Sequence, residues 1–167
     1  IFKFFTKKNK ISIFGVCRDS TKAKKISSEL HGLQVISDFT KKEILEKIIL
    51  QVRPDVVINC VGLIKQINSS SNDLNSKQIN SDFPHLIQSL QKNFNFRFIH
   101  YSTDCIFNGE KGNYKEKDQP NCKDVYGLSK LKGEITKSKN CLTIRTSIIG
   151  HELNSNISLL DWFLSTK

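Results

Sequence analysis

The sequence predicts an α/β fold built on a doubly wound parallel sheet, and three observations support this. Residues 55–59 (Asp-Val-Val-Ile-Asn) form a continuous apolar run, typical of a strand buried on both faces of a parallel sheet. Predicted strands alternate with predicted helices along the chain, and no internal repeat is present. Polar residues follow the predicted strands, and doubly wound sheets bind their ligands at that edge.

The first elements follow from periodicity and turn residues. An alternating, β-rich segment over 11–16 predicts a strand, and residues 21–30 predict a short amphipathic helix. A brief strand is expected over 33–36. The next helix is expected over about 40–51, with Asp38 or Thr40 as its N-cap. Its apolar stripe consists of Ile44, Leu45, Ile48 and Ile49.

The later elements continue this alternation. Pro54 ends the helix, and Asn59 ends the 55–59 strand, either as an Asx-type terminator or as a site residue. After a Ser/Asn-rich polar stretch over 67–77, the expected elements are a helix over about 80–93, a strand over 97–101, a Gly/Asn/Lys/Pro-rich loop over 108–122, a helix over 126–137, a strand over 142–145 and a helical tail over 156–166. Trp162 has helical spacing with Leu159, Leu160 and Phe163, which predicts a core position.

The composition fits one domain spanning residues 1–167. With 167 residues, 38% of them hydrophobic, the chain can bury a real core. No run of about 18 apolar residues is present, so no membrane partner is expected. The five cysteines are odd in number and show no Cys-x-x-Cys spacing, so a zinc site or disulfide framework is not supported and a cytoplasmic protein is expected. The four histidines form no cluster, and no metal is expected.

The net charge of +10 raises nucleic-acid binding as an alternative. The lysines, however, are spread in ones and twos, and no aromatic-plus-basic RNA-binding signature is present. We therefore expect no nucleic-acid partner. An anionic small ligand, such as a phosphorylated nucleotide, is compatible with the charge.

Tyr126 and Lys130 form the strongest chemical signal in the chain. They stand four residues apart, so a helix here places the phenol and the ammonium on one face, one turn apart. Ser102-Thr103-Asp104 stands upstream, at the end of a predicted strand. Such groups together make a carbonyl-reducing site, in which a phenol with an unperturbed pKa of about 10 donates the proton. The alternative is a solvated i,i+4 pair on an exposed helix face.

Five segments resemble the dTDP-4-dehydrorhamnose reductase family, whose members are extended short-chain dehydrogenases/reductases with a Rossmann-like NAD(P)-binding fold. They follow the family's order and spacing and span nearly the whole chain. The segments are Arg53–Asn59, Asn80–Pro84, His100–Phe107, Val125–Glu134 and Leu142–Ser147. The resemblance implies an NADP-dependent oxidoreductase of nucleotide-sugar metabolism, in dTDP-rhamnose biosynthesis.

The implied reaction is hydride transfer from NADPH to the C4 ketone of a nucleotide-linked 6-deoxyhexulose. By the matching motifs, Tyr126 protonates the forming alkoxide and Thr103 hydrogen-bonds the carbonyl oxygen. Lys130 binds the nicotinamide ribose, and its charge lowers the pKa of the phenol. Asp104 contacts sugar hydroxyls, with a turn-forming aspartate as the alternative.

The resemblance also implies a cofactor site. Arg18 stands where an acidic residue would grip the ribose of NAD, so a cation there favours NADPH, while the neighbouring Asp19 keeps NADH open. Asp38 and Phe39 would line the adenine, and the 60–63 segment would pass close to the ribose–phosphate chain. The implied cofactor-binding residues are Arg18, Asp38, Phe39, Cys60, Gly62, Leu63, Tyr101, Tyr126 and Lys130.

Two departures from the family pattern bear on activity. The family's Gly-rich turn, which holds the pyrophosphate, should precede residue 1, and its C-terminal substrate-binding part should follow residue 167. The chain contains no Met and begins with Ile. We therefore expect a fragment that is incomplete at both ends and inactive by itself.

Several alternatives stay open. A 4-epimerase of the same superfamily would use the same Tyr–Lys pair, and a regulatory subunit of the methionine adenosyltransferase type would bind without turnover. A 4,6-dehydratase is disfavoured, because Cys105 stands where that family has a glutamate. The partner is a nucleotide sugar, and a homodimer is not excluded.

Overall fold

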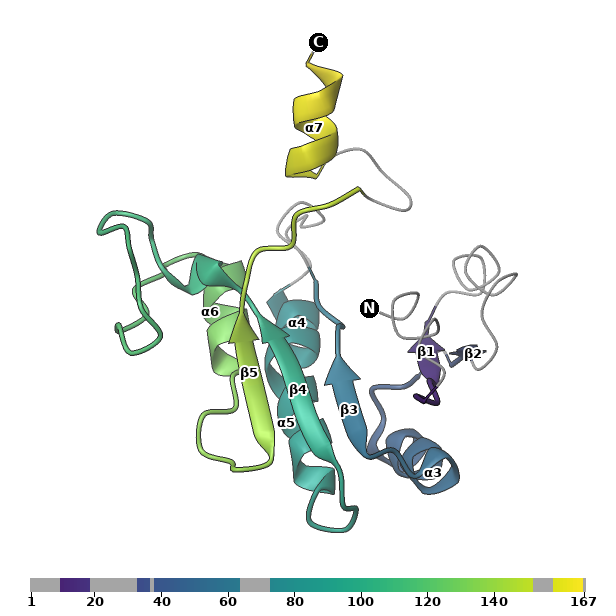
Figure 1. Ribbon diagram of the computed structural model, residues 1–167. Coiled ribbons are helices and arrows are strands. Elements are labelled where there is room, and N and C mark those ends of the chain that lie inside the picture. Colours follow the sequence, from purple (N-terminus) through teal and green to yellow (C-terminus); the bar gives the residue numbers. More distant parts are fainter. Residues whose placement is uncertain (1–9, 19–32, 37, 64–72, 152–157, 167) are drawn as a thin grey trace. The chain divides into compact units, whose positions relative to one another are not determined.

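The computed structural model describes residues 10–18, 33–36, 38–63, 73–151 and 158–166 (Figure 1). The helix predicted over 21–30 lies outside these ranges. The chain divides into two compact units, Ile1–Val57 with His85–Arg97, and Ile58–Pro84 with Phe98–Lys167. Among the described residues, none of the helices combines the length and the apolar character that a membrane span requires.

The first unit contains a pair of short parallel strands. β1 (Gly15–Cys17) pairs with β2 (Leu33–Val35), with Gly15 opposite Leu33, and the Ile36 N–H continues the ladder to the Cys17 carbonyl at 2.9 Å. β2 falls within its predicted range, whereas β1 begins later than the strand expected over 11–16. Parallel pairing requires a crossover connection between the strands, as the predicted alternation demands.

Helix α3 (Lys42–Val52) follows β2, and Ile49 of its apolar stripe is buried. It ends at Arg53, which adopts the left-handed conformation (φ 48°) just before Pro54. The predicted N-cap is wrong: Lys41 occupies that position and no side chain caps the helix. The Asp38 carboxylate instead accepts a 2.9 Å hydrogen bond from the Lys41 ammonium.

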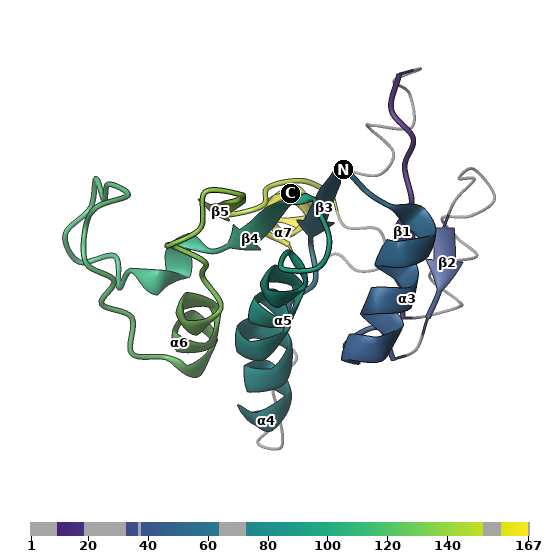
Figure 2. The same ribbon diagram turned by 90° about the horizontal axis from the view of Figure 1, so that it is seen from below.

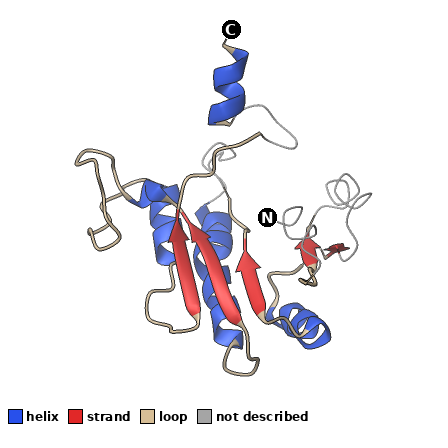
Figure 3. Ribbon diagram, in the orientation of Figure 1, coloured by secondary structure: helices blue, strands red, loops and turns tan. Residues whose placement is uncertain are grey.

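A three-stranded sheet has the order β3-β4-β5 (Figure 3). Its strands are β3 (Val56–Asn59), β4 (Arg97–Ser102) and β5 (Cys141–Arg145). β4 and β5 run parallel from Phe98 opposite Cys141 to Ser102 opposite Arg145. The parallel sheet and its strand positions are therefore confirmed. Val56, Val57 and Ile58 are half-buried, so β3 is not enclosed on both faces as expected.

The helix predicted over 80–93 begins earlier and contains an irregular turn. α4 (Asp73–Ser76) continues as the π-helical segment η2 (Lys77–Asp82) and then as α5 (Phe83–Leu90). Within it the Phe83 N–H bonds the Gln78 carbonyl, five residues back. The polar stretch expected over 67–77 is thus helical from residue 73, because buried contacts override its loop-like composition.

Helix α6 (Val125–Lys132) begins at Asp124, whose carboxylate accepts a 3.1 Å hydrogen bond from the Gly127 N–H. It packs against η2, and both lie on the same side of the sheet formed by β4 and β5 (Figure 2). α6 ends at Lys132, five residues before the predicted end at 137, and Gly133 is its C-cap. A Cβ on Gly133 would collide with the Asn80 carbonyl oxygen, so glycine permits the close approach of α6 and η2.

The helical tail is confirmed as α7 (Leu159–Ser165), which begins at the N-cap Ser158. The core position predicted for Trp162 is wrong, since this side chain is 57% exposed. Leu159 and Phe163 are also exposed. Helical periodicity marked the apolar face of α7 correctly, but the described residues place no partner over that face.

Candidate active site

Helix α6 presents Tyr126 and Lys130 to the end of β4. Lys130 is buried, with 5% of its surface exposed, and its Nζ donates a 2.6 Å hydrogen bond to the Tyr101 carbonyl. Tyr126 is half-buried, and the side chain of Thr103 lies close enough to its phenol to lower the phenol's pKa. Thr103 is itself buried at the first position after β4. The structure therefore brings Tyr126, Lys130 and Thr103 together.

The residues after β4 form a short 3-10 turn, η3 (Asp104–Ile106). Thr103 caps it, because its Oγ1 accepts a 3.2 Å hydrogen bond from the Cys105 N–H. The exposed Asp104 carboxylate accepts a 2.6 Å hydrogen bond from the Ser147 hydroxyl. Asp104 thus stands at the turn, as one of the two interpretations expects, and its carboxylate stays open to a ligand.

Burial shifts both titrating groups of the pair toward their neutral forms. It raises the pKa of the Tyr126 phenol, and the hydrogen bond with Thr103 opposes the rise. It lowers the pKa of the Lys130 ammonium, and the negative charge of Glu134 opposes that fall. The net shift of the Tyr126 pKa is upward, because loss of solvation outweighs the other effects. The lowering of this pKa by the Lys130 charge stays a prediction.

Asn80, in the π-helical segment, was not assigned a site role from the sequence. It is 1% exposed, and its Oδ1 accepts a 2.9 Å hydrogen bond from the Leu63 N–H. Its Nδ2 donates to the Leu63 carbonyl at 3.1 Å and to the Ser129 hydroxyl at 3.0 Å. The adjacent Ser81 donates to the Ser129 carbonyl at 2.8 Å. Asn80 thus ties the segment after β3 to α6, one residue before Lys130.

The segment after β3 passes close to Lys130. A Cβ added to Gly62 would lie 3.7 Å from the Lys130 Nζ and 3.5 Å from the Asn80 Oδ1. Asn59 shapes the start of the segment, since its Oδ1 accepts a 2.9 Å hydrogen bond from the Val61 N–H in an Asx-type turn. Cys60 is exposed and Leu63 is half-buried. Gly62 therefore lies beside Lys130. The cofactor contacts implied for Cys60, Gly62 and Leu63 stay predictions.

An ion pair between Glu134 and Arg145 lies near Lys130, and sequence reasoning did not assign it. Glu134, with a side chain 2% exposed, accepts hydrogen bonds from Arg145 Nε (2.9 Å) and Nη2 (2.8 Å). It also accepts a 2.7 Å hydrogen bond from the Ser102 hydroxyl. Glu134 follows Tyr126 and Lys130 at a repeated spacing of four residues, which is the signal that would have identified it.

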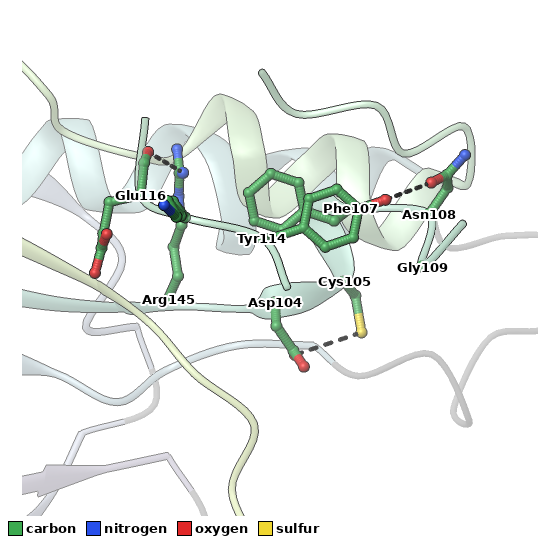
Figure 4. A pocket seen from close by; sticks show the side chains of 9 residues that line it. Asp104, Cys105, Phe107, Asn108, Gly109, Tyr114, Glu116 and Arg145 are labelled. Carbon is green, nitrogen blue, oxygen red and sulfur yellow. Dashed lines mark hydrogen bonds between the residues drawn. The ribbon is translucent and has the colours of Figure 1, made fainter. Parts of the chain in front are cut away.

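A cavity of about 400 Å³ opens beside Arg145 (Figure 4). The loop after η3 forms one wall, where the Phe107 and Tyr114 rings stack with centroids 4.4 Å apart. The Tyr114 hydroxyl donates to the Asn108 Oδ1 at 2.9 Å, which folds the loop back on itself. Asp104, Cys105 and Arg145 also line the cavity. The predicted substrate residue Asp104 therefore lies in the cavity wall.

Three predicted cofactor residues belong to the first unit. Arg18 follows β1 and is exposed, Asp38 is exposed, and Phe39 is buried with 7% of its surface exposed. The other predicted residues belong to the second unit: Cys60, Gly62, Leu63, Tyr101, Thr103, Asp104, Tyr126 and Lys130. The cofactor roles of Arg18, Asp38 and Phe39 stay predictions.

Several known proteins are similar to this chain. A dTDP-4-dehydrorhamnose reductase from Burkholderia thailandensis is 30% identical over 115 residues, which cover 66% of this chain and 39% of that protein. A crystal structure of a hypothetical dTDP-4-dehydrorhamnose reductase from Sulfolobus tokodaii superposes with a TM-score of 0.65 and 29% identity, covering 84% of this chain and 58% of the other. This chain thus spans well under two thirds of these relatives.

A second similar structure contains a dinucleotide. It is a dTDP-4-dehydrorhamnose reductase from Bacillus anthracis in complex with NADP, with a TM-score of 0.55 and 21% identity, covering 66% of this chain and 43% of the other. These likenesses establish a Rossmann-like α/β fold. The family model described as "RmlD substrate binding domain" matches residues 17–159. Since this match covers most of the sequence, the chain belongs to the RmlD substrate binding domain family.

Proposed function

We propose that the protein is an NADPH-dependent reductase of the 4-keto group of a nucleotide-linked 6-deoxyhexulose. The observation that carries the proposal is the meeting of Tyr126 with Thr103 and of Lys130 with the Tyr101 carbonyl, at the carboxyl end of β4. Ligands of open parallel sheets bind at this edge. The similar proteins named as dTDP-4-dehydrorhamnose reductases support the choice of substrate class.

The residues beside Lys130 fit a dinucleotide. Gly62 leaves the space next to the Lys130 Nζ open, where any larger side chain would project. The exposed Arg18 would favour the additional phosphate of NADP. When bound, NADPH supplies the hydride for reduction. Within this chain, Lys130, Gly62 and Leu63 would hold the nicotinamide end.

Tyr126 would act as the general acid. Burial raises the pKa of its phenol, so the hydroxyl keeps its proton at neutral pH until a negative charge develops on the substrate oxygen. Thr103 would hydrogen-bond the same oxygen and orient it toward the phenol. A positioned acid of this kind contributes roughly 10²- to 10⁴-fold to the rate. Asp104, in the cavity wall, would bind sugar hydroxyls.

The decisive experiment uses the full-length protein. We expect it to oxidise NADPH stoichiometrically in the presence of a dTDP-4-keto-6-deoxy sugar, and Tyr126→Phe to abolish oxidation while NADPH still binds. A 4-epimerase returns its hydride and would show no net consumption of NADPH. A regulatory subunit would bind without turnover. Failure to consume NADPH with any 4-keto nucleotide sugar would contradict the proposal, and so would an unimpaired Tyr126→Phe variant.

A further inference from the structure

We propose that Arg145 and Glu134 are positioning residues. Through their ion pair they hold in place both the Lys130 side of the site and the loop after η3 that forms one wall of the cavity, here called the cavity loop. The inference deepens the proposed function and rests on it for the kinetic part of its test. The two members of the pair have different neighbours. Glu134 contacts the end of β4, and Arg145 contacts the cavity loop.

The Glu134 side belongs to a three-part junction that α6 and the residues just after it make with the end of β4. Tyr126, Lys130 and Glu134 follow one another at intervals of four residues. Together they contact the three consecutive residues from Tyr101 to Thr103, where β4 ends. Tyr126 meets the Thr103 side chain, Lys130 the Tyr101 carbonyl, and Glu134 the Ser102 hydroxyl. A displacement of Glu134 would therefore shift both segments that form the Lys130 hydrogen bond. These are the helix that carries Lys130 and the strand end that carries Tyr101.

The Arg145 side holds the cavity loop. Arg145 is the register partner of Ser102 on the neighbouring strand, so both side chains reach Glu134 from adjacent strands. Its remaining Nη1 donates a 3.0 Å hydrogen bond to the Glu116 carbonyl, and the guanidinium lies 5.6 Å from the centre of the Phe107 ring. Figure 4 shows Arg145 beside Glu116 at the cavity.

The chemistry of the pair requires arginine. The planar guanidinium binds both carboxylate oxygens in a fork and still offers a donor to the loop, which a lysine ammonium cannot reproduce with the same geometry. Glu134 is almost fully buried, so loss of these donors would leave its carboxylate oxygens without partners. One side chain thus serves the carboxylate and the loop at once.

The test compares four single variants of the full-length protein by steady-state kinetics. Arg145→Lys keeps the positive charge but loses the paired hydrogen bonds to the two carboxylate oxygens of Glu134. Glu134→Gln keeps one acceptor oxygen and loses the charge. Asn108→Ala releases the loop without touching the pair, since Asn108 accepts hydrogen bonds from Tyr114 and Asn121. Glu46→Gln is the matched control, because its exposed ion pair with Lys42 lies in α3.

For Arg145→Lys we expect the KM for NADPH and the KM for the sugar nucleotide both to rise, with kcat/KM falling about 10- to 100-fold. Glu134→Gln should give the same double effect, Asn108→Ala a rise in the sugar-nucleotide KM alone, and Glu46→Gln no change. A purely structural role would lower the Tm and the fraction of active enzyme while leaving both KM values unchanged. That result, or a change in one KM only for Arg145→Lys, would overturn the inference.

Amide hydrogen exchange separates this inference from the proposed function, because it needs no activity. Arg145→Lys should speed exchange both in the loop, at Lys115 and Asp118, and at the end of α6, at Gly133 and Glu134. These amides are hydrogen-bonded in the structure. Faster exchange in one place only would refute the inference, even in a protein that proved to lack reductase activity. Absence of NADPH oxidation in the unmodified protein would instead refute the proposed function.

Discussion

The side chain of Asn80 forms hydrogen bonds with both polar groups of the Leu63 backbone, at 2.9 Å to the nitrogen and 3.1 Å to the oxygen. A buried primary amide that matches a peptide in this way substitutes for a neighbouring strand. It fixes the chain just after β3, where no ladder continues. The same amide reaches Ser129, so the segment that approaches Lys130 is tied to the helix that carries Lys130.

Asn80→Ala should therefore destabilise the protein by about 1–3 kcal/mol, because it leaves the part-buried N–H and C=O of Leu63 without their partner. The free energy of unfolding in urea measures the loss, and amide exchange should speed up at Leu63. Asn95→Ala, at an exposed asparagine, is the matched control and should change little. Equal stabilities of the two variants would contradict this role for Asn80.

The phenol of Tyr126 should titrate above the ordinary pKa of 10.0, since burial disfavours the phenolate. Ultraviolet titration of wild type and of Tyr126→Phe, taken as a difference, isolates this group from Tyr101 and Tyr114. The Tyr126 component should ionise at higher pH than a free tyrosine. Thr103→Val removes the hydrogen bond that opposes the rise, so it should raise the pKa further. A difference curve centred below 10 would show the opposite sign.

Lys130 makes a testable contribution to stability at alkaline pH. Its folded-state pKa is lowered from 10.5 by burial, so between the folded-state pKa and 10.5 the unfolded chain binds more protons. Stability contributed by this residue must rise with pH in that window. The free energy of unfolding of the wild type relative to Lys130→Met should accordingly increase as the pH approaches 10.5. A flat or falling difference would mean that the ammonium is not desolvated.

Gly133→Ala should be strongly destabilising, because the new methyl group would collide with the Asn80 carbonyl oxygen. Overpacking of this kind costs about 1–3 kcal/mol, and backbone atoms cannot rotate away as a side chain can. Gly150→Ala is the control, since nothing lies within 4 Å of a Cβ there. Thermal unfolding should show a lowered Tm for the first variant and little change for the second.

The sequence predicted best those features that depend on the local pattern of residues. The apolar run at 55–59 became β3, and the hydroxyl-rich end of β4 meets the Tyr126–Lys130 face of α6. The i,i+4 spacing predicted a shared helix face, and parallel pairing brought that face to the strand end. These inferences needed only local periodicity and the rule that ligands bind at the carboxyl edge of the sheet.

Features that depend on tertiary contacts were not predictable. The helix through Asn80 begins within a polar stretch whose composition resembles a loop, because burial of Ser76 and Ile79 determines its conformation. The direction of the Tyr126 pKa shift depends on how much solvent the fold removes, which the spacing of Tyr126 and Lys130 does not contain. Helical periodicity likewise identified the apolar face of α7 but not its exposure.

The π-helical turn at Lys77–Asp82 divides one long helix into two registers. Its neighbouring residues Asn80 and Ser81 both reach Ser129, Asn80 at the hydroxyl and Ser81 at the carbonyl. A π-helical turn accommodates an extra residue within an otherwise regular helix. Deleting one residue from this turn would restore uniform winding but displace the buried residues that hold Ser129, and we expect this change of length to weaken the attachment of α6.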